Sequence, residues 1–426
     1  MHIPDGYLSP LFSLGSGVVT VPAWVVGARR VQRILSNRTV PLLAVFSAFC
    51  FTIMMFNVPV PGGTTAHGVG GTLMAIVLGP WAAVIGVSVA LIIQALFFGD
   101  GGVLAIPANC LNMAVILPFV GYGVYRLIAG QAPLLSARRV WAAGIGAYAG
   151  ITASALAVGA ELGVQPLLFT TNGHPDYSPY GLAQAVPAML LAHSFGASIV
   201  EGLITALGIA YLQRRHPAFL RLRGGAGAPE GTGAAAPRPL WQLIAGAAVA
   251  GVAVLAVAGL VTGGGNPARL FGADWSRVNW PDVAVMLLVV AVLAAVLVPL
   301  AHRFLPGPVR GIGTFFAALA VLAPLGLIAP GFAYGEGSTE DVHQAFGYVP
   351  GGLQHLSGVF SAPLAGYNIP IGFFDGAKAP LWHQAIGYEL AGVIGMLVLG
   401  AVVIGLAALI RVSRAPEASE PEPASA

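Results

Sequence analysis

The chain has 426 residues, of which 57% are hydrophobic and only 8% are charged. A soluble domain carries about a quarter charged residues, so this composition excludes a soluble globular protein and predicts an all-α polytopic membrane protein. The net charge of +3 and the lack of basic patches interleaved with aromatic residues argue against nucleic-acid binding. Cys50 and Cys110 lie in apolar runs and indicate neither a disulfide framework nor a zinc site.

Apolar runs long enough to cross about 30 Å of hydrocarbon recur along the chain. They predict seven spans in the first half, at residues 12–32, 40–57, 67–80, 81–98, 108–129, 139–161 and 185–212. Four more follow at 240–262, 281–302, 311–332 and 387–411. The third run, HGVGGTLMAIVLGP, is short and rich in glycine, so we expect a short or tilted helix there.

Lys and Arg in short loops indicate the cytoplasmic side of a membrane protein. In the first half they cluster at residues 29–38, 126–139 and 214–223, whereas the loops at 58–66, 99–107 and 162–184 contain none. The three clusters share one side only if seven spans precede residue 214, which predicts an extracytoplasmic amino terminus. In the second half Arg303, Arg310, Arg411 and Arg414 follow the same rule, whereas Arg269, Arg277 and Lys378 do not.

These boundaries predict four regions. Residues 1–215 form a seven-helix membrane domain, and residues 216–238 form a flexible cytoplasmic linker, because they include the low-complexity stretch GGAGAPEGTGAAAPR. Residues 239–412 form a second membrane domain of four helices, with a long extracytoplasmic loop at 333–386. The acidic, proline-rich residues 413–426 form a disordered cytoplasmic tail.

The first ten residues, MHIPDGYLSP, predict a metal chelate. Because His2 is too large for methionine removal, we expect Met1 to persist with a free amine. The Met1 amine, the His2 backbone nitrogen and His2 Nδ1 can then close a five-membered and a six-membered ring around one ion. Planar nitrogen ligation suits Ni(II) or Cu(II) and is compatible with low-spin Co(II).

A fourth ligand is expected from His67, which follows the outside loop 58–66 and opens the third span. That position places it on the same side of the membrane as the amino terminus. An intramembrane histidine is a functional hypothesis by default, although its spacing alone leaves a hydrogen-bonded core histidine as an equal alternative.

Three stretches, MHIPDGYLSP, PVPGGTTAHGVGGTLMAIVLGPWAAV and LIIQALFFGDGGVLAIPANCLNMAV, resemble the CbiM/NikM family over about residues 1–215. This resemblance implies a cobalt or nickel substrate-binding (S) component of an energy-coupling-factor (ECF) ABC transporter, with a seven-helix bundle and an amino terminus tucked inward. It assigns the metal ligands to Met1, His2 and His67. It also implies Co²⁺ or Ni²⁺ as bound substrate without a cofactor, and a transmembrane coupling subunit and ATPase subunits as partners.

Several other polar residues lie in or near the spans. Gln94, Asp100, Asn109 and Asn112 are candidates to orient His67 or the amino terminus, with interhelical hydrogen bonding as the favoured alternative. His193 and Glu201 in AHSFGASIVEGLIT are similar to a family pattern in the last span. They suggest a supporting or coupling element, and structural pairing is an equal alternative. His174 is more typical of a surface loop.

The second half is similar to carboxy-terminal extensions of the same family in FGADWSRVNWPD and APLGLIAPGFAYGEGSTED. The family's small CbiN/NikN-like membrane subunit is often fused to the binding component, but four predicted spans depart from its two. The same region holds titratable residues that could feed metal to the site, with a plain extracytoplasmic loop as the favoured alternative: Glu336, Glu340, Asp341, His343, His355 and His383.

Two other classes of function remain to be weighed. A proton-coupled secondary transporter of divalent metal ions would need several buried carboxylates as relays, and the first seven spans offer only Glu161 and Glu201. An intramembrane enzyme is disfavoured because the chain has no nucleophile elbow and no HExxH motif. The chain also lacks a GxxxxGK[ST] loop, so ATP hydrolysis is expected in separate subunits. The expected location is a bacterial cell membrane.

Overall fold

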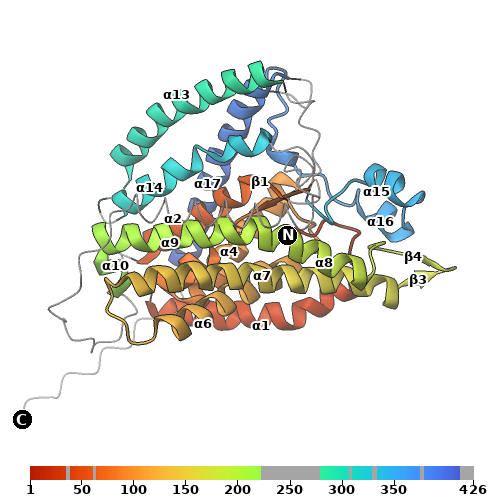
Figure 1. Cartoon of the computed structure of the whole chain (residues 1–426), viewed down its shortest axis with the longest axis horizontal. Helices are drawn as coiled ribbons and strands as arrows, with labels where there is room; N and C mark the ends of the chain where they lie inside the picture. Colours follow the sequence, from red (N-terminus) through yellow and green to blue (C-terminus); the bar gives the residue numbers. More distant parts are fainter. Residues whose placement is uncertain are drawn as a thin grey trace, which may run out of the picture.

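A computed structural model describes residues 1–34, 39–60, 64–221, 279–305, 307, 309–328, 333–374 and 379–412 (Figure 1). Several predictions fall outside these residues, namely most of the linker at 216–238, the span at 240–262 and the tail at 413–426. The same holds for the basic residues Arg38, Arg223, Arg269, Arg277, Lys378 and Arg414.

Long apolar helices build the first half of the chain and match six of the seven predicted spans. They are α1 (Pro10–Ile34), α2 (Thr39–Met55), α4 with η1 (Pro80–Ile93, Gln94–Phe98), α5 with η2 and α6 (Ile106–Asn109, Cys110–Ile116, Leu117–Ala129), α7 (Ala137–Leu168), and α8 with η3 and α9 (Leu182–Ala192, His193–Ala197, Ser198–Arg215). A short α10 (Pro217–Arg221) follows. Within the described residues, eight helices are long and apolar enough to cross a membrane. The protein is therefore an all-α polytopic membrane protein, as the composition predicts.

The third predicted span, at 67–80, contains a short helix, as its glycine-rich run predicts. A hairpin of β1 (Asn57–Val60) and β2 (Thr64–His67) leads into it, and α3 (Gly71–Leu78) is its helix. Eight residues at 1.5 Å each span about 12 Å, so α3 itself covers only part of about 30 Å of hydrocarbon. It ends at Gly79, whose φ of 98° is a conformation that glycine adopts readily and other residues rarely do. Pro80 then starts α4. Every residue of α3 is buried, because the surrounding long helices enclose it.

Three long helices contain a π-helical segment, in which one extra residue is accommodated per turn. These segments are η1, η2 and η3, and they begin at Gln94, Cys110 and His193. Such π-bulges are frequent at functional sites. Each of these three segments contains a polar residue that the sequence singles out, namely Gln94, Asn112 and His193.

The longest helix of the bundle, α7, packs against α6, α8 and α9 through small residues. A Cβ added to Gly144 would lie 3.2 Å from the Gly202 carbonyl oxygen, and a Cβ added to Gly202 would lie 3.0 Å from the Gly144 carbonyl oxygen. Such close backbone approach is the usual packing mode of membrane helices. It holds α9, and with it Glu201, firmly against α7.

The second half packs directly on this bundle. Its long helices are α13 (Trp280–Phe304), α14 with η5 (Arg310–Ala320, Ala323–Ile328) and α17 (Leu381–Val412), which match three predicted spans. The loop expected at 333–386 contains the short helices α15 (Thr339–Phe346), α16 (Gly351–Leu356) and η6 (Ala365–Tyr367). Helix α17 packs on α2 and α4, and α14 packs on α2. Phe316 of α14 stacks on Phe49 of α2 with 4.0 Å between ring centroids.

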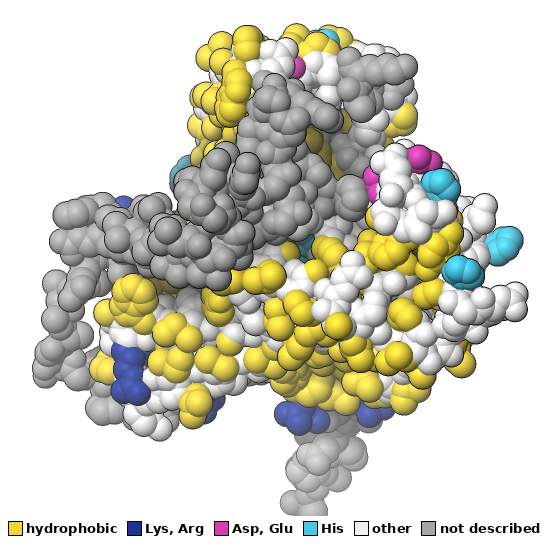
Figure 2. All heavy atoms as spheres, turned by 45° about the vertical axis from the view of Figure 1, so that its right-hand side comes forward, with side chains coloured by type: hydrophobic (Ala, Val, Ile, Leu, Met, Phe, Trp, Pro, Cys, Tyr) yellow, Lys and Arg dark blue, Asp and Glu magenta, His cyan; other side chains and the backbone are white. Residues whose placement is uncertain are grey.

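The two ends of the bundle differ in charge. At one end of Figure 1 lie the connection between α6 and α7 and the end of α9, and at the other lie α15, α16 and the hairpin of β3 (Thr170–Thr171) and β4 (His174–Pro175). Figure 2 shows Lys and Arg side chains on the left and lower parts of the visible face, and acidic and histidine side chains on the right. This separation agrees with the loop charges.

Candidate metal site

The amino-terminal segment is inserted into the bundle rather than exposed on it. Met1, His2 and Ile3 are at most 3% exposed. Asn109 of α5 holds this segment through two hydrogen bonds, because the Ile3 amide donates to Asn109 Oδ1 (2.8 Å) and Asn109 Nδ2 donates to the Ile3 carbonyl (3.1 Å). The Gly102 amide also donates to the Ile3 carbonyl, at 2.8 Å. These hydrogen bonds therefore fix both the amide and the carbonyl group of Ile3.

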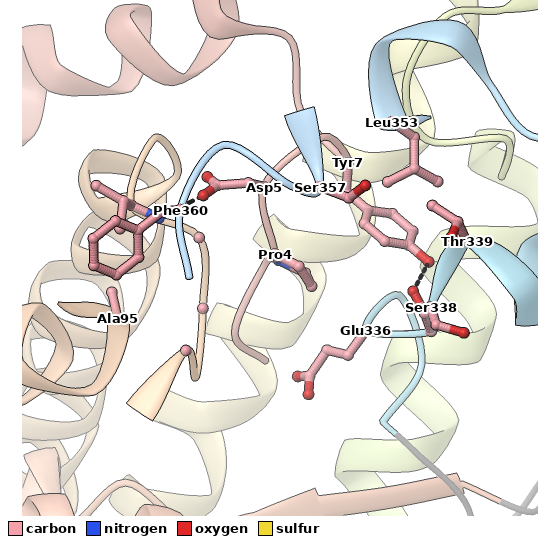
Figure 3. Close-up of a pocket in the computed structure, with 15 residues that line it drawn as sticks. Pro4, Asp5, Tyr7, Ala95, Glu336, Ser338, Thr339, Leu353, Ser357 and Phe360 are labelled. Carbon is pink, nitrogen blue, oxygen red and sulfur yellow. Dashed lines mark hydrogen bonds between the residues drawn. The ribbon is translucent and has the colours of Figure 1, made fainter. Parts of the chain in front are cut away.

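Asp5 anchors the segment from its other end. Its carboxylate accepts hydrogen bonds from the amides of Val103 (3.0 Å) and Leu104 (2.8 Å). A Cβ on Gly102 would lie within 2.3 Å of the Asp5 backbone nitrogen, so only glycine allows this approach. Figure 3 shows Asp5 beside a cavity of ≈ 380 Å³ that the amino-terminal segment shares with Glu336 and Ser338 of the second half.

His2 and His67 face one another inside the bundle, with 3.1 Å between His2 Nδ1 and His67 Nε2. His67 Nδ1 donates to the Gly68 carbonyl at 3.0 Å, because a carbonyl oxygen only accepts. In the neutral ring His67 Nε2 is therefore the nitrogen with the free lone pair. Both rings are buried, and no more than 3% of either residue is exposed.

The opposite side of His2 is hydrogen-bonded as well. Gln94 Nε2 donates to the Tyr367 hydroxyl at 2.8 Å, so Gln94 Oε1 faces His2 and accepts from His2 Nε2 at 3.3 Å. The hydroxyl of Tyr367 in turn donates to Asp100 Oδ2. Burial, and secondarily the positive charge of the Met1 amine, lower the pKa of His2 to about 4. His2 is therefore neutral at physiological pH, with its Nδ1 lone pair free.

The lone pair of His2 Nδ1 consequently has two neighbours that also carry lone pairs. They are His67 Nε2 at 3.1 Å and Asp100 Oδ1 at 3.0 Å. With no proton between them they repel one another, and a cation among them would remove that repulsion. Metal-binding histidines usually donate their other N–H to a carbonyl or amide oxygen, as both rings do here. Two nitrogens bound at right angles to one ion at about 2.0 Å are about 2.8 Å apart, close to the 3.1 Å between these rings.

The Met1 amine lies beside this pair and is held by the second half. Its nitrogen is 3.0 Å from Glu336 Oε1. Within the residues that the structure describes, no three His, Cys, Asp or Glu side chains gather as a metal-binding group. A metal site at this place would therefore need the terminal amine or backbone nitrogens in addition to the two rings.

The other predicted residues divide into two groups. Gln94, Asp100 and Asn109 contact His2 or Ile3 directly, as described above. Asn112 instead donates from Nδ2 to Glu161 Oε2 at 2.7 Å, which is interhelical hydrogen bonding between η2 and α7. His193 begins η3, where its Nδ1 donates to the Met189 carbonyl at 2.8 Å, and its Nε2 has no hydrogen-bond partner among the described residues.

Glu201 supports the segment that follows His67. Its carboxylate accepts hydrogen bonds from the backbone amides of Val69 (2.7 Å) and Gly70 (2.9 Å), at the amino terminus of α3. A helix amino terminus favours a negative charge. Glu201 on α9 therefore fixes the backbone two residues beyond His67.

The histidines of the long loop lie apart from the described contacts of His2 and His67. His383 stacks on Phe373 with 4.0 Å between ring centroids, and the loop residue His174 lies against Tyr348. Sequence reasoning missed the roles of Asp5 and Tyr367. Asp5 stands in the MHIPDG motif and could have been noticed there, whereas nothing around Tyr367 in LAGYNIP marks it.

The fold and this buried pair of histidines define a multi-pass membrane protein whose amino-terminal segment is inserted beside His67. A family model described as CbiM, the cobalt uptake substrate-specific transmembrane region, matches residues 2–219. The chain therefore belongs to the CbiM family. As a member it is a component of a transport system and not an enzyme.

Full-length similarity extends this relationship over both halves. The fused nickel transport protein NikMN of Rhodobacter capsulatus is 38% identical over 96% of this chain and 98% of its own length. The probable fused nickel transport protein LarMN of Lactiplantibacillus plantarum is 36% identical over 95% and 97%. A crystal structure of a truncated transition metal transporter is 54% identical, covers 51% of this chain and 100% of its own, and has a TM-score of 0.48.

Proposed function

We propose that this chain is the substrate-binding membrane subunit of an ECF-type ABC transporter that takes up Co²⁺ or Ni²⁺. The observation that carries the proposal is the pairing of His2 Nδ1 with His67 Nε2 at 3.1 Å while the outer nitrogens of both rings are engaged elsewhere. The names of the relatives support nickel or cobalt as the transported ion. Planar ligation that includes a backbone nitrogen favours Ni²⁺ chemically, and the family serves both metals.

In this proposal four nitrogens bind the ion in one plane. They are the Met1 amine, the His2 backbone nitrogen, His2 Nδ1 and His67 Nε2. Binding requires the amine to leave Glu336 and lose its proton, and it requires the His2 backbone amide to lose its proton as well, since ligands bind metals in their deprotonated form. Gln94 and Asn109 keep their hydrogen bonds to His2 and Ile3, so the chelate is oriented before the ion arrives.

We further propose that residues 239–412 take the part of the small membrane subunit that other transporters of this family carry as a separate chain. The second half contacts the amino-terminal segment at two points, because Glu336 binds the Met1 amine (3.0 Å) and the Tyr7 hydroxyl donates to the Gly337 carbonyl (2.8 Å). Relatives named as fused proteins match over almost the whole chain. Coupling and ATPase subunits are then separate chains.

The proposed orientation places the amino terminus and the metal site towards the outside, and the ends of α9 and α17 in the cytoplasm. The basic clusters and the acidic end of the molecule support this orientation. An accessibility reporter at residue 225 should read cytoplasmic and one at residue 345 extracytoplasmic. If both read the same side, the count of seven plus four crossings is wrong.

The experiment that tests the proposed site is metal binding by the purified full chain in detergent. His2→Ala and His67→Ala should each lower Ni²⁺ and Co²⁺ affinity by more than the roughly 10–100-fold that loss of a supporting residue costs. His174→Ala, on the β3–β4 hairpin, is the matched control and should bind normally. Wild-type affinity in both ligand variants would refute the site. Elemental analysis after loading with mixed ions then identifies the preferred metal.

A further inference from the structure

Tyr367 is a residue of the second half that reaches the amino-terminal site, and it is 7% exposed. Its ring stacks on Phe98 of η1 with 4.9 Å between ring centroids, and the ring of Tyr388 lies 5.4 Å away. The Leu364 amide donates to the Phe97 carbonyl at 2.9 Å, which attaches the same loop to the end of η1. Packing therefore holds the tyrosine ring in place independently of its hydroxyl.

The backbone of Tyr367 has an uncommon conformation. Its φ is 59°, in the left-handed region that few residues other than glycine adopt. Gly366 before it has a φ of 64°, so the chain turns sharply at this point. A strained backbone persists only where the surrounding structure holds it, and such positions concentrate at functional sites. The loop thus places this hydroxyl at a cost in backbone energy, which points to a role beyond packing.

The hydroxyl of Tyr367 determines the orientation of the Gln94 amide. It donates its one proton to Asp100 Oδ2, because a carboxylate only accepts. The hydroxyl oxygen is then an acceptor for Gln94, so the Gln94 atom at 2.8 Å is the amide nitrogen Nε2. The same nitrogen lies 3.4 Å from Asp100 Oδ2. A flipped amide would turn its oxygen towards the hydroxyl oxygen and the carboxylate, and both would repel it.

The orientation of the amide in turn determines which nitrogen of His2 carries the proton. Gln94 Oε1 accepts from His2 Nε2 at 3.3 Å, so Nδ1 of the neutral ring keeps its lone pair for a metal ion. With the amide flipped, its NH₂ group would donate to His2 Nε2, and the ring proton would move to Nδ1. Asp100 Oδ1, which lies 3.0 Å from Nδ1, would accept it there. A protonated Nδ1 cannot bind an ion.

We propose that Tyr367 is a positioning residue through which the second half selects the metal-binding tautomer of His2. It acts on the His2 ring through Gln94. This inference rests on the proposed function, since the tautomer matters only if His2 Nδ1 is a ligand. It gives the fused second half a direct part in preparing the site, in addition to the ion pair of Glu336 with the Met1 amine.

The tautomer can be measured in the full chain in detergent before any metal is added. The protein is labelled with ¹⁵N-histidine, and the His2 signals are those that His2→Gln removes. Protonated and unprotonated ring nitrogens have well separated ¹⁵N chemical shifts, and Nε2 is recognised because it couples to both carbon-bound ring protons. The wild type should carry the proton on Nε2. Tyr367→Phe, which keeps the packed ring, should move it largely to Nδ1.

Two further variants separate this route from general damage. Tyr388→Phe is the matched control, because Tyr388 also lies in the second half and its buried hydroxyl donates to the Met55 carbonyl at 2.6 Å. It should keep the wild-type tautomer. Gln94→Met keeps the length of the side chain and removes the amide, so it should change the tautomer as Tyr367→Phe does. It also tests the route if Tyr367→Phe does not fold.

Affinity gives a second readout. Tyr367→Phe should weaken Ni²⁺ and Co²⁺ binding by about 10–100-fold, and Gln94→Met and the double variant should show the same loss, because both residues act by one route. Losses that add up in the double variant, an unchanged tautomer in Tyr367→Phe, or a wild-type His2 with its proton on Nδ1 overturn the inference. A wild-type protein that has the expected tautomer and binds neither ion instead refutes the proposed function itself.

Discussion

The Met1 amine is buried and paired with a carboxylate of the second half. Met1 is 2% exposed, and its nitrogen is 3.0 Å from Glu336 Oε1. Adding one residue before Met1 converts this amine to an amide and moves the new amine by about 3.5 Å along the chain. Ligand distances at metal sites tolerate changes of about 0.2 Å. The displaced amine is therefore far outside bonding range of an ion held by His2 and His67.

The extended protein keeps both histidines, so it distinguishes a terminal chelate from a site made only of side chains. We expect it to lose one of four planar ligands and the ion pair with Glu336 together. Its affinity for Ni²⁺ and Co²⁺ should fall by at least about 100-fold, which is the upper end of the range for loss of a residue that only supports a ligand. The extension is best produced by protease cleavage that leaves a single glycine before Met1.

The assay is titration calorimetry with Ni²⁺ and Co²⁺ on wild-type and extended protein in the same detergent. A tag of equal length after Ala426 is the control and should leave both affinities unchanged. Metal uptake by cells that express the full transporter should follow the same order. Normal binding by the extended protein would show that Met1 is not a ligand, and the proposed site would then reduce to a pair of histidines.

Three further outcomes are expected. Glu201→Gln should lower metal affinity by about 10–100-fold, because the backbone next to His67 loses a charged hydrogen-bond acceptor. Unchanged affinity would show that α3 alone fixes that backbone. Glu336→Gln should raise affinity by about fivefold, since an ion pair worth about 1 kcal/mol no longer holds the Met1 amine; a fall would indicate that Glu336 is itself a ligand. Burial lowers the pKa of His2 from its ordinary value of 6.5 to about 4, so the neutral ring stabilises the fold above pH 6.5, and this contribution is lost as the pH falls towards 4. Thermal melting of the protein without metal should show that loss, and His2→Gln should weaken the pH dependence; equal pH dependence in both would contradict the assignment.

The helices could largely be predicted from the sequence because hydrophobicity over about 20 residues is a local property. At 67–80 the glycine-rich run predicts a short or tilted helix, and the structure shows a helix of eight residues preceded by a hairpin that the sequence did not predict. A short apolar run does not reveal whether lipid or protein surrounds it. Here the neighbouring helices bury α3 completely, so its length need not match the bilayer.

The π-helical segments were also beyond sequence reasoning. Each replaces the i→i+4 backbone hydrogen bonds of the α-helix by i→i+5 bonds over about one turn. No residue pattern in QALFF or HSFGA predicts a π-helical segment. It nevertheless determines which way Gln94 and His193 project.

The sequence by itself determined the membrane class, the approximate spans and three candidate ligands, because Met1 and His2 are adjacent and His67 stands in a family motif. Only the tertiary structure decided how that site is supported. Asn109, Gln94 and Glu336 reach the first three residues across 106, 92 and 335 positions. Such contacts depend on how helices pack and on where π-helical segments turn their side chains. No local pattern encodes that packing, so the supporting contacts and the free nitrogen of His193 became visible only in the folded chain.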